Sequence, residues 1–180
     1  KHFILFKNKY IFLYMNTIYE VADYLVNISD YKTENIQELF KFNDKVQIVK
    51  LLTHQKIWKK IIDKEEETIN IIIEPGFSLR EEPTDLPNGI CLLDKQNIEC
   101  IQKWNLLPVD TIKPYYNLQN YTITRSQAIE LLKISIFETP IETIFQKKFD
   151  IYYSNFDYIS GTFSNKLYIN KCLSLFDILK

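Results

Sequence analysis

The feature that most constrains the fold of this chain is a helix start at Thr124. The Thr124 side chain can accept a hydrogen bond from the backbone N–H of Gln127, and the Gln127 side chain can accept one from the N–H of Thr124. This capping box predicts a helix over residues 124–137, which ends before Pro140. Apolar residues fall on several faces of the helix and leave only a narrow polar strip. We therefore expect a central helix with neighbours on several sides.

The segment 17–62 also carries a series of helix signals. Thr17 and Glu20 form a second capping box, which predicts a first helix from residue 17. Apolar periodicity and polar residues at the expected starts, Thr33, Asp44 and Thr53, predict further short helices that end near residue 62. We expect three or four short antiparallel helices. The alternative of an F-box over residues 44–62 lacks a Leu-Pro opening and has the wrong spacing between Val46 and Trp58.

The helical period stops after the charged run at residues 63–67, and strand signals follow it. Residues 68–74 contain an isoleucine run that is typical of a buried strand, and Pro75-Gly76 ends it. Residues 90–94 and 97–101 predict a hairpin that places Cys91 opposite Cys100. The expected fold class is therefore mainly α: a multi-helix domain with a small β-hairpin and strand insertion around residues 68–101.

The C-terminal third begins with a helix signal at Thr139, where Pro140 takes the favoured first helical position of a helix that reaches Phe145. Residues 150–161 are aromatic and read as irregular. Ser164 predicts the start of the last helix, with large side chains along one side of it: Tyr168, Cys172, Leu175, Phe176 and Leu179.

Composition limits the class of protein. A chain of 180 residues with 46% apolar residues can bury one ordinary core, so we expect a single domain over residues 15–180. Residues 1–14 read as an N-terminal extension, because the single methionine, Met15, directly precedes the first expected helix; an edge strand or a packed aromatic arm is the alternative. The apolar run at residues 10–15 is too short for a signal peptide or a membrane span. An intracellular protein, cytoplasmic or nuclear, is expected, with no membrane partner.

Net charge and cysteine count narrow the partners further. A formal net charge of -1 argues against nucleic acid as a partner, because nucleic-acid binding usually needs a basic face. Three cysteines without metal-ligand spacing read as reduced thiols of an intracellular protein, although Cys91 and Cys100 would lie within disulfide distance in the expected hairpin.

Candidate chemistry is sparse. His54 could act as an acid–base group with Asp63 or Glu67, but a solvent-facing histidine near a helix start is the simpler interpretation. The glutamates at residues 65–67 project in different directions and read as solvent-exposed surface residues rather than as a glycosidase carboxylate site. The aromatic residues could stack an adenine, but they follow the helix stripes and read as core. We assign no catalytic, cofactor-binding or metal-ligating residue and expect no cofactor.

Three segments follow one another in the order of a known family. The run 123–137 has a Thr-Arg-Ser-Gln start and a Leu-Leu-containing helix, residues 155–159 read Asn-Phe-Asp-Tyr-Ile, and residues 166–176 run from Lys-Leu to Leu-Phe. They resemble the Thr/Ser-Leu-Ser-Gln, Asn-Phe-x-x-Leu-Phe and Lys-Leu…Leu-x-x-Tyr-Phe segments of poly(ADP-ribose) glycohydrolases. Residues 104–108 lie where that family often has an Ile-Pro-Leu-Leu turn. The likeness covers residues 106–179, under half of the chain.

This resemblance implies a helical accessory domain of a poly(ADP-ribose) glycohydrolase-like protein. The family is a glycosyl hydrolase whose chemistry lies in a macrodomain with a Gly-Gly-Gly loop and a Gln-Glu-Glu motif, and neither occurs here: Gly76, Gly89 and Gly161 stand far apart. The chain is thus expected to be inactive alone, with a macrodomain in cis or in trans as its partner and with poly(ADP-ribose) reached only through that partner. The alternative is a stand-alone α-helical protein–protein interaction module.

The resemblance also implies where such a partner would dock. In the family the last helix leads into the macrodomain, so contact residues are expected at the C-terminal end. We expect several of the large side chains there to be exposed: Tyr152, Tyr153, Phe156, Tyr158, Phe163, Tyr168, Phe176 and Leu179.

Overall fold

The computed structural model describes residues 16–94, 103–106, 120–154 and 156–173. The strands are β1 (Thr17–Glu20), β2 (Ile69–Ile73), β3 (Phe77–Leu79), β4 (Ile90–Leu92), β5 (Trp104–Leu106), β6 (Asn120–Thr124), β7 (Ile151–Ser154) and β8 (Ile159–Gly161). The α-helices are α1 (Thr33–Leu39), α2 (Lys45–Ile62), α3 (Arg125–Leu132), α4 (Ile141–Lys148) and α5 (Lys166–Leu173), and two 3-10 turns lie at Val21–Tyr24 and Ile28–Asp30. Among the described residues, no helix combines the length and the apolar character that crossing a membrane requires.

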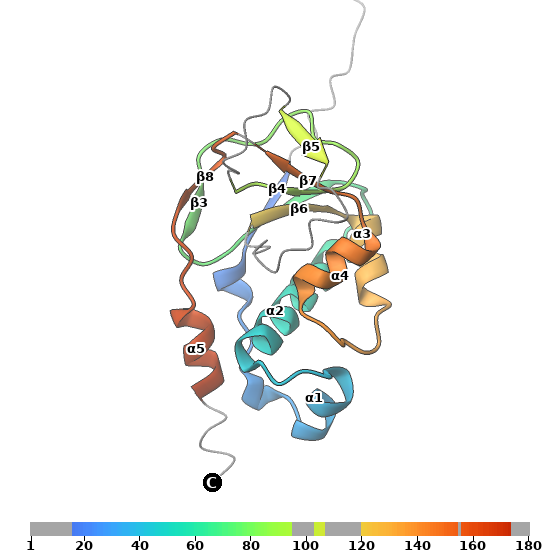
Figure 1. Ribbon diagram of the computed structural model, residues 1–180, viewed down its shortest axis with the longest axis vertical. Coiled ribbons are helices and arrows are strands. Elements are labelled where there is room, and N and C mark those ends of the chain that lie inside the picture. The colour runs from blue at the N-terminus through green and yellow to red at the C-terminus, as the bar shows by residue number, and fades with distance from the viewer. Residues whose placement is uncertain (1–15, 95–102, 107–119, 155, 174–180) are drawn as a thin grey trace, which may run out of the picture.

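A six-stranded mixed sheet organises the molecule (Figure 1). Its strand order is β1-β2-β6-β4-β7-β5; the pairs β1–β2 and β4–β7 are parallel, and the other pairs are antiparallel. The expected mainly α fold, with β structure only as an insertion around residues 68–101, is therefore wrong. The protein is α/β, because β1, β5, β6 and β7 come from outside that insertion and complete the sheet around β2 and β4.

The sheet is covered on both faces, and β2 shows why. Successive side chains of a strand point to opposite faces. Ile72 belongs to the larger core, which the sheet shares with the helices, while Ile71 and Ile73 belong to a smaller core with Tyr158 and Ile159. The second core lies under the two-stranded sheet of β3 and β8. The layers are thus helices, main sheet and β3–β8 pair, which is why β2 reads as a continuous apolar run rather than an alternating one.

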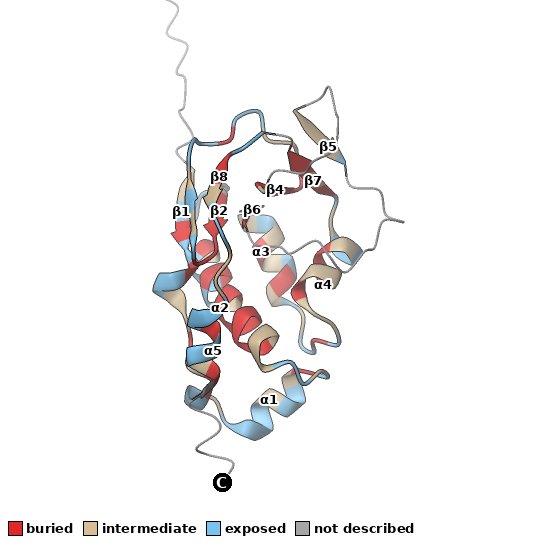
Figure 2. Cartoon of the chain, turned by 60° about the vertical axis from the view of Figure 1, so that its left-hand side comes forward, coloured by how far each residue is buried: buried red, intermediate tan, exposed pale blue. Residues whose placement is uncertain are grey.

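Helix α2 lies at the centre of the helical layer, and Figure 2 shows it as the most buried helix. It begins where the sequence predicts, because the Asp44 side chain accepts a hydrogen bond from the Gln47 N–H at 3.1 Å. The expected break at Thr53 is wrong. Thr53 lies inside the helix, donates its hydroxyl to the Val49 carbonyl at 2.8 Å and accepts from the Val26 N–H, so it joins α2 to the preceding chain. Helix α1, by contrast, is largely exposed (Figure 2).

Two of the expected helices are wrong in type or length. The box at Thr17 does not start a helix: Thr17–Glu20 is strand β1, which pairs in parallel with β2. The capping box at Thr124 is confirmed, with both of its hydrogen bonds present. The helix that follows ends at Leu132 instead of residue 137, and Phe137 then donates its N–H to the Leu39 carbonyl at 2.7 Å in an extended bridge. The β-branched residues Ile134 and Ile136 favour that extended course.

The remaining segments show further differences. The expected hairpin is not how β4 pairs: Cys91 lies opposite Thr122 of β6 and Tyr152 of β7, and Cys100 lies outside the described residues. Helix α4 is confirmed, but Pro140 rather than Thr139 is its N-cap residue. The segment expected to be irregular contains β7 and β8. Helix α5 is confirmed over Lys166–Leu173, two residues after the expected start at Ser164, while its expected continuation to Leu179 and the expected extension at residues 1–14 lie outside the described part of the chain.

Candidate functional site

A cluster of buried polar side chains fills the space between α2 and the sheet. Lys50, His54 and Trp58 lie along one line of α2, spaced by four residues, and this line faces the sheet. Glu74, directly after β2, and Tyr121 of β6 meet them there. Two further members come from other helices, Glu142 from α4 and Tyr168 from α5. We call these seven residues the polar cluster.

His54 is the centre of the cluster. Its Nε2 lies 2.9 Å from Glu74 Oε1, and its Nδ1 lies 2.7 Å from the hydroxyl oxygen of Tyr121. Trp58 donates its indole N–H to the same hydroxyl oxygen at 3.1 Å. Glu74 accepts only, so we assign the His54 proton to Nε2, with the Tyr121 hydroxyl donating to Nδ1. In this arrangement each of these groups has a partner.

The Glu74 carboxylate is the common acceptor for donors from several other elements. The Tyr168 hydroxyl donates to Glu74 Oε2 at 2.5 Å, and Lys50 Nζ lies 3.6 Å from Glu74 Oε1 and 3.2 Å from Glu142 Oε1. The backbone N–H of Glu74 donates to the side chain of Asn120 in β6. Through these contacts the single residue Glu74 joins β2 to α2 and α5 by its carboxylate and to β6 by its backbone N–H.

The pKa shifts follow from burial and from these partners. Burial alone would raise the pKa of the Glu74 carboxyl, but the hydrogen bond from His54, the charge of Lys50 and the hydrogen bond from Tyr168 outweigh burial and lower the pKa. Glu74 is therefore ionised in the folded protein. Burial and the nearby Glu74 charge raise the pKa of Tyr168, and burial raises the pKa of Tyr121 well above its usual value. Both phenols stay protonated and neutral.

The chain of carboxylate, imidazole and hydroxyl has the outline of a nucleophile activated by a base. In such a site the hydroxyl faces the substrate. Here the Tyr121 side chain is 0% exposed, its oxygen already takes the Trp58 N–H, and its raised pKa opposes ionisation. His54 is also 0% exposed. The arrangement fixes α2, α4 and α5 against the sheet, and the His54 and Tyr121 side chains are not exposed to a reacting molecule.

The structure changes the interpretation of the residues considered from sequence. His54 is not solvent-facing, and its carboxylate partner is Glu74 rather than Asp63 or Glu67. The glutamates at residues 65–67 are exposed, as expected, and Glu67 accepts a hydrogen bond from the Ser126 N–H. Sequence reasoning missed the other members of the cluster, and the helix start expected at Thr53 separated Lys50 from His54 and Trp58, which lie on one line of α2.

The large C-terminal side chains are mostly buried within this domain. Tyr153, Tyr158 and Tyr168 are buried, Tyr152 and Phe163 are half-buried, and Phe156 is 47% exposed. Phe176 and Leu179 lie outside the described residues. The expectation that several of the set are exposed thus holds, among those described, for Phe156 alone.

Phe156 belongs to a stack of aromatic rings on the β3–β8 side of the main sheet. Its ring lies 6.1 Å from that of Tyr158, which in turn stacks on Trp104 of β5 at 5.7 Å. Lys103 Nζ lies 5.4 Å from the Phe156 ring centroid. Leu106, two residues after Trp104 and therefore on the same face of β5, is 52% exposed. We call Trp104, Leu106 and Phe156 the aromatic surface.

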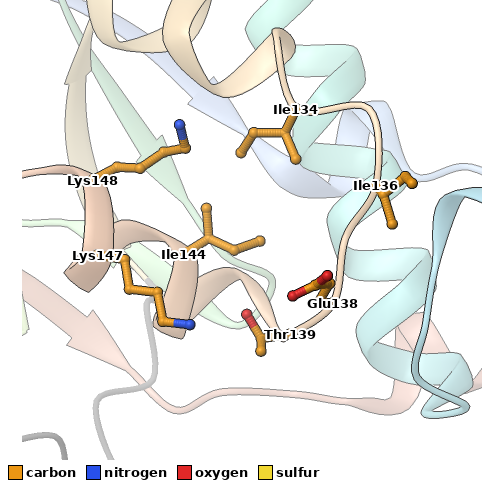
Figure 3. A pocket seen from close by; sticks show the side chains of 7 residues that line it. All are labelled: Ile134, Ile136, Glu138, Thr139, Ile144, Lys147 and Lys148. Atoms are coloured by element: carbon orange, nitrogen blue, oxygen red, sulfur yellow. The ribbon is translucent and has the colours of Figure 1, made fainter.

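Several hollows open on the helical side. One of about 170 Å3 is lined by Ile134, Ile136 and Ile144 together with polar side chains (Figure 3). A second, of about 320 Å3, lies between α1, α2 and the end of α3. A third, of about 300 Å3, lies at the start of α2, where Lys50 and Phe163 line it. The described residues include no group of three or more His, Cys, Asp or Glu side chains placed to hold a metal ion.

Comparisons of the chain with protein-family models, with curated proteins and with solved structures found no match.

Proposed function

We propose that this chain is an accessory domain that acts by docking onto another protein and performs no chemistry of its own. The observation that carries the proposal is the aromatic surface, where Leu106 and Phe156 are half exposed on a stacked aromatic base. Exposed apolar groups gathered on one face are typical of an interaction site. The groups of the polar cluster that suit acid–base chemistry, His54, Tyr121 and Glu74, are buried and paired with one another.

The first candidate partner is a macrodomain of the poly(ADP-ribose) glycohydrolase type, in cis or in trans. The ordered resemblance over residues 106–179 supports it, and two of its segments contain the helices α3 and α5. Phe156 lies within the Asn-Phe segment of that resemblance. On this proposal poly(ADP-ribose) is degraded by the partner, and this chain supports the partner's fold or position.

A stand-alone protein–protein interaction module is the second candidate. The sheet favours it, because β6 and β7 occupy parts of the segment where the resemblance implied helices. The two candidates share the aromatic surface and differ in the protein that covers it.

The strength of the surface can be approximated from its exposure. Fully burying a large apolar side chain is worth roughly 1.5–3 kcal/mol, and about half of each of Leu106 and Phe156 is already buried. Covering the rest of both gives about 2 kcal/mol, which is about thirtyfold in affinity.

Calorimetric titration of the purified chain with a purified poly(ADP-ribose) glycohydrolase macrodomain tests the first candidate. We expect binding, weakened about thirtyfold by the double variant Leu106→Ser and Phe156→Ser. The matched control is Ile18→Ser with Ile169→Ser, two side chains that are each 45% exposed on β1 and α5. Equal weakening by the control would refute the aromatic surface, and no binding by the wild-type chain would favour the second candidate.

An activity assay tests the other half of the proposal. The purified chain is incubated with poly(ADP-ribose), and free ADP-ribose is measured. We expect none above the rate without protein. Release that disappears in a Glu74→Gln variant of the polar cluster would show that the chain is an enzyme.

A further inference from the structure

The two hollows near the end of α3 form a second surface, on the helical side of the main sheet. The segment from Leu132 to Thr139 lines both of them, the larger through Leu132 and the smaller through Ile134 and Ile136. Phe137 fixes this segment by its backbone bond to Leu39, which itself lines the larger hollow. The two hollows are therefore neighbours on either side of one anchored stretch of chain.

The apolar residues that line the hollows are mostly aliphatic. Leu39, Leu52 and Leu132 line the larger one together with Tyr31, and Ile134, Ile136 and Ile144 line the smaller one. Ile136 is 48% exposed, one of the most exposed large apolar side chains in the described residues. Figure 3 shows Ile134 and Ile144 extending toward the same space from the two sides of the smaller hollow. Each hollow is suited to an aliphatic or aromatic side chain.

The rims carry an excess of positive charge. Lys56 and Lys59 line the larger hollow and Lys147 and Lys148 line the smaller one, and among the residues that the structure describes Glu138 is the one carboxylate that lines either hollow. The ion pairs found in the described part of the chain use none of these four lysines. The chain as a whole has a net charge of -1, so this concentration of lysines is a local feature.

We propose that this surface, the basic two-hollow surface, binds an acidic peptide segment of a partner protein, with apolar side chains of the peptide in the hollows and its carboxylates beside the lysines. Charge complementarity selects the acidic character, and the aliphatic lining selects the apolar side chains. Nucleic acid fits less well, because its recognition combines a basic groove with several aromatic platforms for the bases, and among the described residues Tyr31 is the one aromatic side chain that lines the two hollows. This surface lies on the opposite side of the main sheet from the aromatic surface, so the inference stands whether or not that surface docks.

An array of synthetic peptides tests the chemistry of the occupant. The peptides are about 12 residues long, enough to span about 40 Å when extended. One set mixes Asp and Glu with Leu, Ile and Phe at varied spacing; the second replaces the apolar residues with Ser; the third replaces the acids with Lys. Labelled full-length chain is applied at about 50 mM and about 300 mM salt.

We expect the acidic apolar set to bind at least about tenfold more strongly than either control set, and its binding to weaken at the higher salt. Equal binding of the acidic serine set would overturn the proposal in favour of a general polyanion site. Failure of the first set to exceed the lysine set would also overturn it, as would tighter binding of a single-stranded oligonucleotide spotted on the same array.

Variants then locate the site with the strongest peptide, measured by fluorescence anisotropy. Lys147→Glu with Lys148→Glu should weaken binding at least about tenfold, and a peptide with two acids changed to Lys should recover part of the loss. Ile136→Ser should weaken binding about fivefold. Matched controls are Lys64→Glu with Lys166→Glu, two exposed lysines that line neither hollow, and Ile169→Ser. Site variants that bind like the wild-type chain, or controls that lose as much affinity, would refute the location.

Discussion

Replacing Glu74 with alanine should remove a large part of the stability of this protein. The Glu74 side chain is 0% exposed, accepts hydrogen bonds from His54 and Tyr168, and lies 3.6 Å from Lys50. Without the Glu74 carboxylate, the buried donors of His54 and Tyr168 have no acceptor, and Lys50 has only its ion pair with Glu142. Breaking a buried charge pair costs roughly 3–5 kcal/mol, a large share of the roughly 5–15 kcal/mol that holds an ordinary domain folded.

Urea unfolding followed by circular dichroism measures this loss. With a slope of about 2 kcal/mol per molar urea, the midpoint of Glu74→Ala should fall by roughly 2 M. Glu74→Gln should cost about 2 kcal/mol, because the amide keeps the shape and one acceptor but removes the charge beside Lys50. The control Glu65→Ala, at an exposed residue, should change stability by no more than about 0.5 kcal/mol. A loss below about 1 kcal/mol in Glu74→Ala would refute the cluster as a mutually paired unit.

Three further outcomes follow from the structure. The partners of Glu74 lower its pKa, so its contribution to stability is complete above the unfolded pKa near 4.5 and is lost as pH falls through the lower folded pKa. Urea midpoints measured between about pH 7 and about pH 3 should therefore fall less steeply in Glu74→Gln than in the wild-type chain. Burial raises the pKa of Cys91 to about 12, so iodoacetamide at about pH 8 should leave Cys91 unlabelled in the native protein and label it in urea, as mass-spectrometric mapping would show. Thr124→Ala removes the acceptor of the Gln127 N–H and should cost about 1 kcal/mol in urea unfolding, whereas an unchanged midpoint would show that the cap does not stabilise α3.

Local signals predicted those parts of the fold that local interactions decide. The caps at Asp44 and Thr124 start α2 and α3 as expected, and the isoleucine run gives β2. The Thr17 pattern wrongly predicted a helix, because Thr-x-x-Glu also fits a strand in which Tyr19 is buried and Ile18 and Glu20 are exposed. Pairing with β2 outweighed helix propensity there.

The main sheet was not predictable from neighbouring residues. Strand β7 pairs in parallel with β4, which lies about sixty residues earlier in the chain, and no short-range pattern announces that partner. Residues 150–161 have no helical period and therefore read as irregular, although their aromatic residues favour β structure. The resulting burial of Tyr153 and Tyr158 also explains why fewer aromatic side chains are exposed than expected.

The polar cluster was not predicted from the sequence. Lys50, His54 and Trp58 share one buried face of α2, but other faces of this helix also carry Lys and Gln, and the helix start expected at Thr53 separated Lys50 from the other two. Their partners Glu74 and Tyr121 come from two different strands, and only the pairing of β2 with β6 brings them together. Which residues pair with those of α2 therefore depends on the strand topology and not on spacing in the sequence.

Solvent access to the His54 ring tests the central claim most directly, because a docking domain needs this cluster closed and an enzyme would need it open. In the nuclear magnetic resonance spectrum of the 15N-labelled chain, we predict a ring N–H proton on Nε2 that is held by Glu74, resolved from bulk water and slow to exchange. A His54 ring proton that exchanges too fast to be observed in the folded protein would contradict the account and place this imidazole in contact with solvent and substrate.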